Sequence, residues 1–176
     1  MSTILLDTSI LGRMANTNDV DHRVVVAAVN ALIARGHTLC ITPQNLVEFR
    51  NFATRPKLVN GLGLTAAEAA SVSADFQARF DFLQETPAIH PAWQAVVDPL
   101  GILGKQVHDA RLVAVCVVHA VSAILTFNVG HFTRLAAAVP ASPSLIPAPF
   151  DVKASAGSRG TRERPGIGPC IGLRSA

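Results

Sequence analysis

The stretch Thr3–Ser9 constrains the fold of this chain more than any other. Three aliphatic residues, Ile4-Leu5-Leu6, follow one another without polar alternation, a pattern typical of a strand covered on both faces in a parallel sheet. Asp7 and two hydroxyl residues come next, and Ile10 begins a new apolar pattern. Because open α/β sheets bind ligands beyond the carboxyl ends of their strands, Asp7 is a candidate site residue. Asp, Ser and Thr are also good helix N-caps, so a plain capping role is the alternative.

Strand and helix patterns alternate along the rest of the chain. We expect further strands at residues 38–41, 86–89, 122–125 and 145–146. Helices are expected at residues 20–35, 42–54, 65–83, 91–97, 109–120 and 129–138. This alternation predicts an α/β fold of three layers, α/β/α, around a central parallel sheet of about five strands.

The charge distribution suggests where the folded domain ends. The chain of 176 residues has 49% hydrophobic and 15% charged residues, enough for one substantial core. Its formal net charge of +3 resides wholly in residues 151–176, where five Lys/Arg residues outnumber two acidic ones. This segment is rich in Gly, Pro and Ser. We therefore expect a folded domain at residues 1–150 and a basic, disordered tail at residues 151–176.

The cysteines and the apolar runs bear on localisation. Cys40, Cys116 and Cys170 form no CxxC pair, and two of them lie in apolar runs, which favours buried thiols in a reducing cytoplasm. No basic segment precedes the first apolar run, so no signal peptide is expected. The long uncharged stretch at residues 112–129 contains polar side chains, and we interpret it as a buried helix and strand rather than a membrane span.

Three more polar side chains are expected near Asp7. Glu48 lies in the helix after the second strand, Asp109 begins a later helix, and Asn128 follows the strand at 122–125. Each has an ordinary alternative: a solvated helix face for Glu48, an N-cap for Asp109 and a turn amide for Asn128. However, most of the group is expected at strand ends or adjacent helix starts on one rim of the sheet, so we expect these side chains to lie together.

Such a constellation has a chemical meaning. Crowded carboxylates repel one another and stay ionised when a cation neutralises them. A ligand set of oxygens without a Cys/His cluster selects a hard ion such as Mg²⁺ or Mn²⁺. Ions of this kind keep bound water and bind substrate phosphates. The pattern therefore favours phosphodiester hydrolysis with a metal-activated water as nucleophile.

Four stretches of the chain carry a family resemblance. Residues 5–11, 45–49, 108–112 and 125–132 resemble, in order, those of PIN-domain ribonucleases, especially the VapC-type toxins of bacterial toxin–antitoxin pairs. The likeness spans residues 1 to about 147. It implies a five-stranded parallel sheet, RNA cleavage that depends on Mg²⁺ or Mn²⁺, and control by a cognate antitoxin protein. A homodimer is also expected.

The resemblance assigns roles to single residues. Asp7, Glu48 and Asp109 match the three central acidic positions, with Asp7 and Asp109 expected to ligate the metal. Asn128 falls at the fourth catalytic position, which is often Asp, and His131 falls where a further Asp is common. Because fewer negative charges then remain for a second ion, we expect one tightly held metal, with any second ion arriving only with substrate.

RNA affinity rests largely on neutralising backbone phosphates. The candidates for RNA binding are Arg13, Arg50, Arg55, Lys105 and Arg111, with plain solvated surface as the alternative for each. One tryptophan and no tyrosine argue against a dedicated base-stacking platform, so recognition of RNA shape is favoured.

Two other functions remain open. The altered fourth position leaves room for a catalytically weak PIN-like module that binds RNA or protein, and the metal dependence of cleavage separates it from a nuclease. A nucleotide-binding or receiver-like α/β domain is disfavoured because no GxGxxG or GxxxxGK[ST] loop follows the first strand. Two structural assignments are also made: His119 as a packed core histidine, and the stripe of Phe76, Phe80 and Leu83 as core, with a dimer or antitoxin groove as its alternative.

Overall fold

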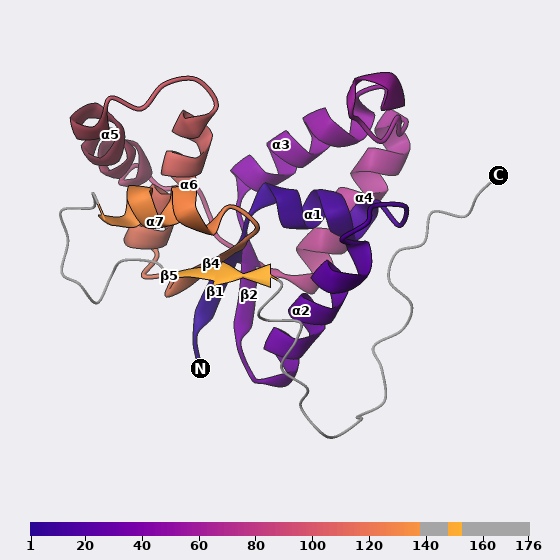
Figure 1. Cartoon of the computed structure of the whole chain (residues 1–176), viewed down its shortest axis with the longest axis horizontal. Coiled ribbons are helices and arrows are strands. Elements are labelled where there is room, and N and C mark those ends of the chain that lie inside the picture. The colour runs from indigo at the N-terminus through magenta and orange to yellow at the C-terminus, as the bar shows by residue number, and fades with distance from the viewer. Residues whose placement is uncertain (138–147, 153–176) are drawn as a thin grey trace.

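The computed structural model describes residues 1–137 and 148–152 and places helices on both sides of a central sheet (Figure 1). The sheet has five strands in the order β3-β2-β1-β4-β5, and the paired strands run parallel. The strands are β1 (Thr3–Leu6), β2 (Thr38–Ile41), β3 (Asp81–Phe82), β4 (Ala123–Thr126) and β5 (Ala148–Asp151). The predicted α/β/α architecture is confirmed.

The middle strand, β1, is covered on both faces, as its aliphatic run predicts. Ile4 and Leu6 belong to one core cluster and Leu5 to the other, and all three are fully buried. The split follows from the alternation of side chains along a strand. Cys40 of β2 and Ile124 of β4 lie on the same face as Leu5. The sheet therefore separates two hydrophobic cores.

Four helices cover the face of Ile4 and Leu6, on the right in Figure 1. The rings of Phe49 and Phe76 pack edge to face in this core, with centroids 5.2 Å apart. Phe76 and Phe80 are buried here, so these two residues of the apolar stripe are core residues. The helices are α1 (Thr8–Ala15), α2 (His22–Ala34), α3 (Pro43–Thr54) and α4 (Ala66–Arg79), with a short 3-10 turn at Lys57–Val59.

Three helices cover the opposite face, on the left in Figure 1: α5 (Ile89–Leu100), α6 (Gln106–Val118) and α7 (Val129–Ala137). Gly101 and Gly104 join α5 to α6 with φ of 56° and 58°, a left-handed conformation that glycine adopts without strain. Trp93 of α5 donates a hydrogen bond from Nε1 to the Val107 carbonyl at 2.9 Å. This contact fixes the first turn of α6 against α5.

The region between α4 and α5 differs from the sequence-based prediction. The helix expected at 65–83 ends at Arg79, because Phe80 has extended backbone and Asp81–Phe82 pair with Cys40–Ile41 as β3. The strand expected at 86–89 is wrong, since these residues lead into α5. A strand of two residues is too short to leave a periodic signal in the sequence.

The last described segment, residues 148–152, bears on where the folded domain ends. The edge strand predicted at 145–146 lies outside the described residues, as do residues 153–176. Strand β5 ends at Asp151, and Val152 is fully buried in the core with Ile4 and Leu6. The folded chain therefore extends past residue 150, where the sequence placed the domain boundary.

One histidine departs from its predicted place. His119 is not a packed core residue: it follows the last turn of α6, is half-buried, and its Nε2 lies 3.0 Å from the Gln84 carbonyl. Within the described ranges, none of the helices has the length and apolar character needed to cross a bilayer.

Candidate active site

The predicted acidic residues gather at the carboxyl ends of β1 and β4. From β1 the chain first builds β2 and β3 on one side, and it later places β4 and β5 on the other. The order of the strands therefore reverses between β1 and β4, which is where open α/β sheets bind ligands. Asp7 directly follows β1, and Thr126 is the last residue of β4. The starts of α3 and α6 complete the site.

Asp7 is both a helix cap and a site residue. Its Oδ1 accepts a hydrogen bond from the Ser9 backbone N–H at 3.4 Å, which caps α1. Its Oδ2 accepts from Ser9 Oγ at 2.7 Å and from Thr126 Oγ1 at 2.8 Å. The backbone N–H of Asp7 donates to the Leu125 carbonyl at 3.0 Å, continuing the ladder between β1 and β4. The two sequence-based interpretations of Asp7 are therefore compatible.

Thr126 is a functional candidate that the sequence did not single out. It is fully buried, and its hydroxyl donates to Asp7 while accepting from the Asn128 backbone N–H at 3.0 Å. A hydroxyl residue at the end of an otherwise apolar strand was the available signal. Thr126 thus orients one oxygen of Asp7.

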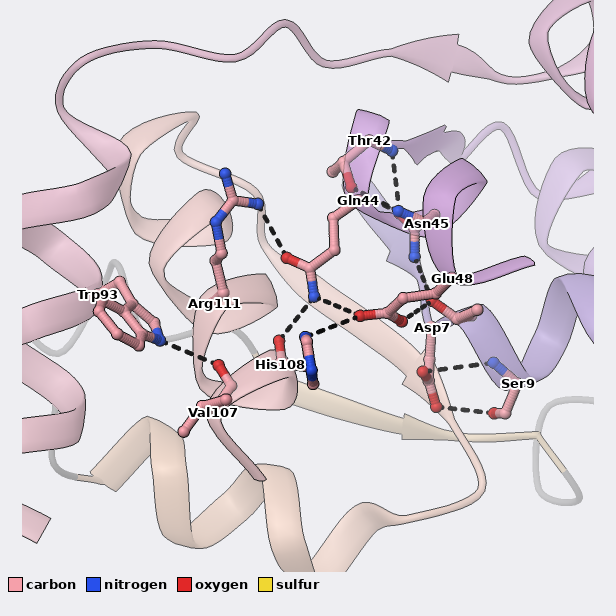
Figure 2. Close-up of polar contacts among 11 residues, drawn as sticks. Asp7, Ser9, Thr42, Gln44, Asn45, Glu48, Trp93, Val107, His108 and Arg111 are labelled. Carbon is pink, nitrogen blue, oxygen red and sulfur yellow. Dashed lines mark hydrogen bonds and ion pairs between the residues drawn. The ribbon is translucent and has the colours of Figure 1, made fainter. Parts of the chain in front are cut away.

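Both oxygens of the Glu48 carboxylate are held. Oε2 accepts a hydrogen bond from Thr8 Oγ1 at 2.6 Å, and Oε1 accepts from Gln44 Nε2 at 2.7 Å. His108 Nδ1 lies 3.5 Å from Oε1 (Figure 2). Glu48 therefore faces the site from α3, rather than the solvated surface that its polar stripe allowed.

Asn45 is a second candidate that was missed. It is fully buried, and its Oδ1 accepts hydrogen bonds of 2.9 Å from both the backbone N–H and Oγ1 of Thr42. Its Nδ2 donates to the Leu6 carbonyl at 3.1 Å and to Thr8 Oγ1 at 3.0 Å. Asn45 therefore ties the start of α3 to the end of β1. The capping box it forms with Thr42 was the signal in the sequence.

Asp109 lies in the first turn of α6, in the field of the other carboxylates. Burial first, and then the negative charges of Asp7 and Glu48, raise the pKa of Asp109 to about 6, although His108 acts in the opposite direction. The three predicted carboxylates therefore interact electrostatically. Repulsion of this kind favours the binding of a cation at the cluster.

His131 contacts this cluster from α7. Its Nε2 lies 3.1 Å from Asp109 Oδ2, although the geometry of the pair is not that of a hydrogen bond. Burial, and then the charge of Arg134, lower the pKa of His131, which favours the neutral form of its imidazole. His131 is thus close to Asp109, a predicted metal ligand.

Asn128 reaches the site through its backbone. Its N–H donates to Thr126 Oγ1, and its carbonyl accepts from Phe132 N at 3.2 Å at the start of α7. The side chain is exposed. A role for the Asn128 amide in metal binding stays a prediction.

The basic candidates fall into two groups. Arg13 lies over the Phe127 ring at 4.3 Å, and its Nε is 3.8 Å from Asp19 and 3.7 Å from Asp21. Arg111 donates to Gln44 and pairs with Glu85. These two arginines are thus engaged within the chain. The other three candidates, Arg50, Arg55 and Lys105, are exposed.

The donor chemistry of the cluster fits a divalent cation. Asp7, Glu48 and Asp109 offer carboxylate oxygens, which Mg²⁺ and Mn²⁺ prefer. Among the residues that the structure describes, no three His, Cys, Asp or Glu side chains are arranged to hold an ion as they stand. The oxygens of Asp7 and Glu48 instead accept hydrogen bonds from hydroxyls and an amide. A cation would offset the repulsion that raises the Asp109 pKa, so the residues fit a metal.

The chain is similar to known proteins in sequence and in fold. VapBC2 from Rickettsia felis, solved bound to a DNA fragment from its promoter, has a TM-score of 0.60 at 15% identity, covering 85% of this chain and 98% of that chain. FitAcB from Neisseria gonorrhoeae has a TM-score of 0.55 at 16% identity, covering 85% and 97%. FitAB bound to an IR36 DNA fragment also has a TM-score of 0.55, at 15% identity, covering 90% and 99%.

The sequence itself decides the family. No curated protein matches the chain. The model of the PIN domain matches residues 4–138, a span that contains Asp7, Glu48, Asp109 and Asn128. This span includes four of the five strands, together with helices α3 and α6, which carry Glu48 and Asp109. The chain therefore belongs to the PIN domain family.

Proposed function

We propose that this protein is a metal-dependent endoribonuclease that hydrolyses RNA phosphodiester bonds. The observation that carries the proposal is the electrostatic coupling of Asp109 to Asp7 and Glu48 at the carboxyl ends of the strands. Three carboxylates in one half-buried site repel one another and lower the stability of the fold. Such a destabilising arrangement is typical of a functional site, here one that binds a cation. Membership of the PIN domain family supports the same activity.

Each site residue has a distinct task under this proposal. Asp7 and Asp109 would hold a Mg²⁺ or Mn²⁺ ion, and the hydroxyls of Thr126 and Ser9 fix the orientation of the Asp7 carboxylate. A bound divalent ion supplies an activated water and offsets negative charge on the scissile phosphate. Glu48, held by Thr8 and Gln44, accepts a hydrogen bond from the attacking water and directs it to the phosphorus. Asn128 contributes a neutral oxygen at the fourth position.

We also propose that the nuclease is the toxin of a toxin–antitoxin pair. The sequence resembles VapC-type toxins, and the fold is similar to VapBC2 and FitAB, both solved with DNA fragments. A cognate antitoxin protein and a homodimer are the partners that this resemblance implies. The RNA backbone would contact the exposed basic residues Arg50, Arg55 and Lys105, and we place the protein in the cytoplasm.

The test of the nuclease activity is direct. Purified protein is incubated with total RNA in Mg²⁺, in Mn²⁺ or in EDTA, beside Asp7→Asn and Asp109→Asn variants of equal folded fraction. Cleavage that requires the metal and both aspartates supports the proposal. Absence of cleavage by the folded wild type in either metal would contradict it, and RNA binding in that sample would favour the non-catalytic PIN-like module.

The toxin role needs a separate experiment. Induced expression of the wild-type chain in a bacterial host should arrest growth, whereas Asp7→Asn should not. Co-expression of the neighbouring gene, if it encodes the antitoxin, should restore growth and allow the two proteins to be purified together. Normal growth with abundant, folded wild-type protein would remove the toxin assignment while leaving the nuclease assignment intact.

A further inference from the structure

The side-chain amide of Gln44 links Glu48 in α3 to helix α6 on the opposite side of the sheet. Its Nε2 donates to Glu48 Oε1 at 2.7 Å and to the His108 carbonyl at 2.9 Å. Its Oε1 accepts from Arg111 Nη1 at 2.9 Å. Figure 2 shows this amide between α3, which carries Glu48, and α6, which carries His108 and Arg111. Gln44 therefore connects two helices on opposite sides of the sheet.

This hydrogen-bond pattern fixes the orientation of the amide. A flipped Gln44 would turn its NH₂ group toward the Arg111 guanidinium, which offers only donors. It would also turn its oxygen toward a carboxylate and a carbonyl, which offer only acceptors. All three contacts would be lost. The amide has one favourable orientation, and in it an N–H points at Glu48.

Arg111 holds the Gln44 amide from the other side. While Nη1 donates to Gln44, Nη2 pairs with the Glu85 carboxylate in the loop before α5. The planar guanidinium thus makes two directional contacts at once, which a lysine ammonium cannot reproduce. The phosphate contact that the sequence suggests for Arg111 stays a prediction beside these two contacts within the protein.

We propose that Gln44 and Arg111 are positioning residues that orient the Glu48 carboxylate for hydrolysis. The inference rests on the proposed function, in which Glu48 directs the attacking water. Thr8 Oγ1 holds one carboxylate oxygen at 2.6 Å, and the relay from Glu85 through Arg111 and Gln44 holds the other. Two anchored oxygens stop rotation of the carboxylate, and small errors in such geometry cost rate rather than substrate affinity.

The chain supplies matched controls for both positioning residues. Arg134 Nη2 donates to the Gln106 amide at 2.8 Å, and Arg79 Nη2 donates to the Asn30 amide at 3.0 Å. These are guanidinium–amide links between helices that make no contact with the acidic cluster in the described hydrogen bonds and ion pairs. Gln106→Met is therefore the control for Gln44→Met, and Arg79→Lys is the control for Arg111→Lys.

Single-substrate kinetics with a short RNA give the first readout. Gln44→Met should lower kcat about tenfold, equivalent to about 1.4 kcal/mol, with KM changed by less than about twofold. Arg111→Lys should lower kcat by a smaller factor, because the lysine ammonium retains the positive charge but cannot contact Gln44 and Glu85 at the same time in the same directions. The double variant should be no slower than Gln44→Met, since both residues act through one link. Both controls should keep the wild-type kcat.

A second readout does not depend on cleavage. The side-chain NH₂ resonances of Gln44 in a ¹⁵N-resolved NMR spectrum should move in Arg111→Lys and in Glu48→Gln, and should stay in place in Arg79→Lys. This result would establish the relay even if the protein cleaved no RNA, so failure of the proposed nuclease and failure of the relay are distinguishable.

Three results would each overturn the inference. The first is a wild-type kcat in folded Gln44→Met, and the second is a set of Gln44 resonances that respond to neither Arg111→Lys nor Glu48→Gln. The third is a loss of kcat accompanied by a shift in the emission of Trp93, the single tryptophan, whose Nε1 donates to the Val107 carbonyl at the start of α6. That shift would show that the substitution displaces α6, which is a structural role. Unchanged emission with reduced kcat supports positioning of Glu48.

Discussion

His131 Nε2 lies 3.1 Å from Asp109 Oδ2, yet the two residues do not behave as an ion pair. An ion pair would lower the pKa of the carboxyl and raise that of the imidazole. Here burial dominates both groups: the pKa of Asp109 is raised to about 6 and that of His131 is lowered. The contact therefore places an imidazole whose neutral form is favoured beside the Asp109 carboxyl, whose charged form is disfavoured by the other carboxylates.

This arrangement predicts how the stability of the metal-free protein depends on pH. The folded-state pKa of Asp109 is about 6 and the unfolded value is 3.8, so the folded state binds the proton more tightly. The stabilisation that protonated Asp109 contributes to the fold is fully present below pH 3.8 and is lost as the pH rises through about 6. Asp109→Asn should lack this component and should melt at a higher temperature than wild type at pH 7. Melting curves in EDTA from pH 4 to pH 7 provide the measurement; parallel curves for the two proteins would contradict it.

Thr126→Val should impair the site with little change in volume. The variant removes the hydroxyl that donates to Asp7 at 2.8 Å, and it leaves the Asn128 N–H without that acceptor. We expect a loss of about 1–3 kcal/mol in the free energy of unfolding and a lower kcat. Chemical denaturation and RNA cleavage measure the two effects. Thr133→Val, which removes an exposed hydroxyl bonded to the Val129 carbonyl within α7, is the matched control and should change both much less.

Asn45→Ala should destabilise the junction of α3 and β1. The substitution leaves the buried Leu6 carbonyl without its Nδ2 donor and removes the capping box with Thr42. The expected cost is about 2–4 kcal/mol, the sum of a lost cap and an unpaired buried acceptor. Asn51→Ala, at an exposed position of the same helix, should cost less than about 0.5 kcal/mol. Similar denaturation midpoints for the two variants would show that Asn45 is not an anchor.

Asn128→Asp should tighten Mn²⁺ binding if this position faces the ion. The substitution replaces a neutral amide oxygen by a charged carboxylate at the same distance from the backbone, which strengthens the field at the metal. Calorimetric titration of Mn²⁺ into both proteins measures the change. Equal affinities would place Asn128 outside the coordination sphere and leave it the backbone role seen at the start of α7.

Truncation after Val152 should weaken RNA binding without slowing the cleavage step. The removed segment carries five Lys/Arg residues and one Glu, whereas the candidate metal ligands all precede it. RNA binding should weaken and its salt dependence should decrease, because fewer counterions are released. Single-turnover cleavage at saturating RNA should stay close to wild type. A lower single-turnover rate in folded, truncated protein would show that the segment helps to build the site.

Strands β1, β2 and β4 and the acidic cluster could be predicted because each leaves a local pattern. The aliphatic run Ile4–Leu6 is buried on both faces, and the Thr42-Pro43 pair starts α3 where the sequence places it. Parallel strands end at one rim, so the residues after β1 and β4 were expected to meet. The fold followed from these local rules.

What could not be predicted depends on partners far along the chain. Asn45 and Thr126 are buried polar residues whose role is defined by Leu6 and Asp7, separated from them by 39 and 119 residues. No spacing rule connects such pairs in a single sequence. The pairing of Arg111 with Gln44 and Glu85 could not be predicted for the same reason, because it exists only after α3, α6 and the loop before α5 have packed.

The position of β1 also bears on protein synthesis. This strand is made before the other four strands, yet it is the middle strand of the sheet, and its neighbour β4 is made only at residues 123–126. Until β4 emerges, one edge of β1 has no strand to pair with, and neither Asp109 nor Thr126 can be fixed beside Asp7. The acidic cluster therefore cannot assemble on a short nascent chain.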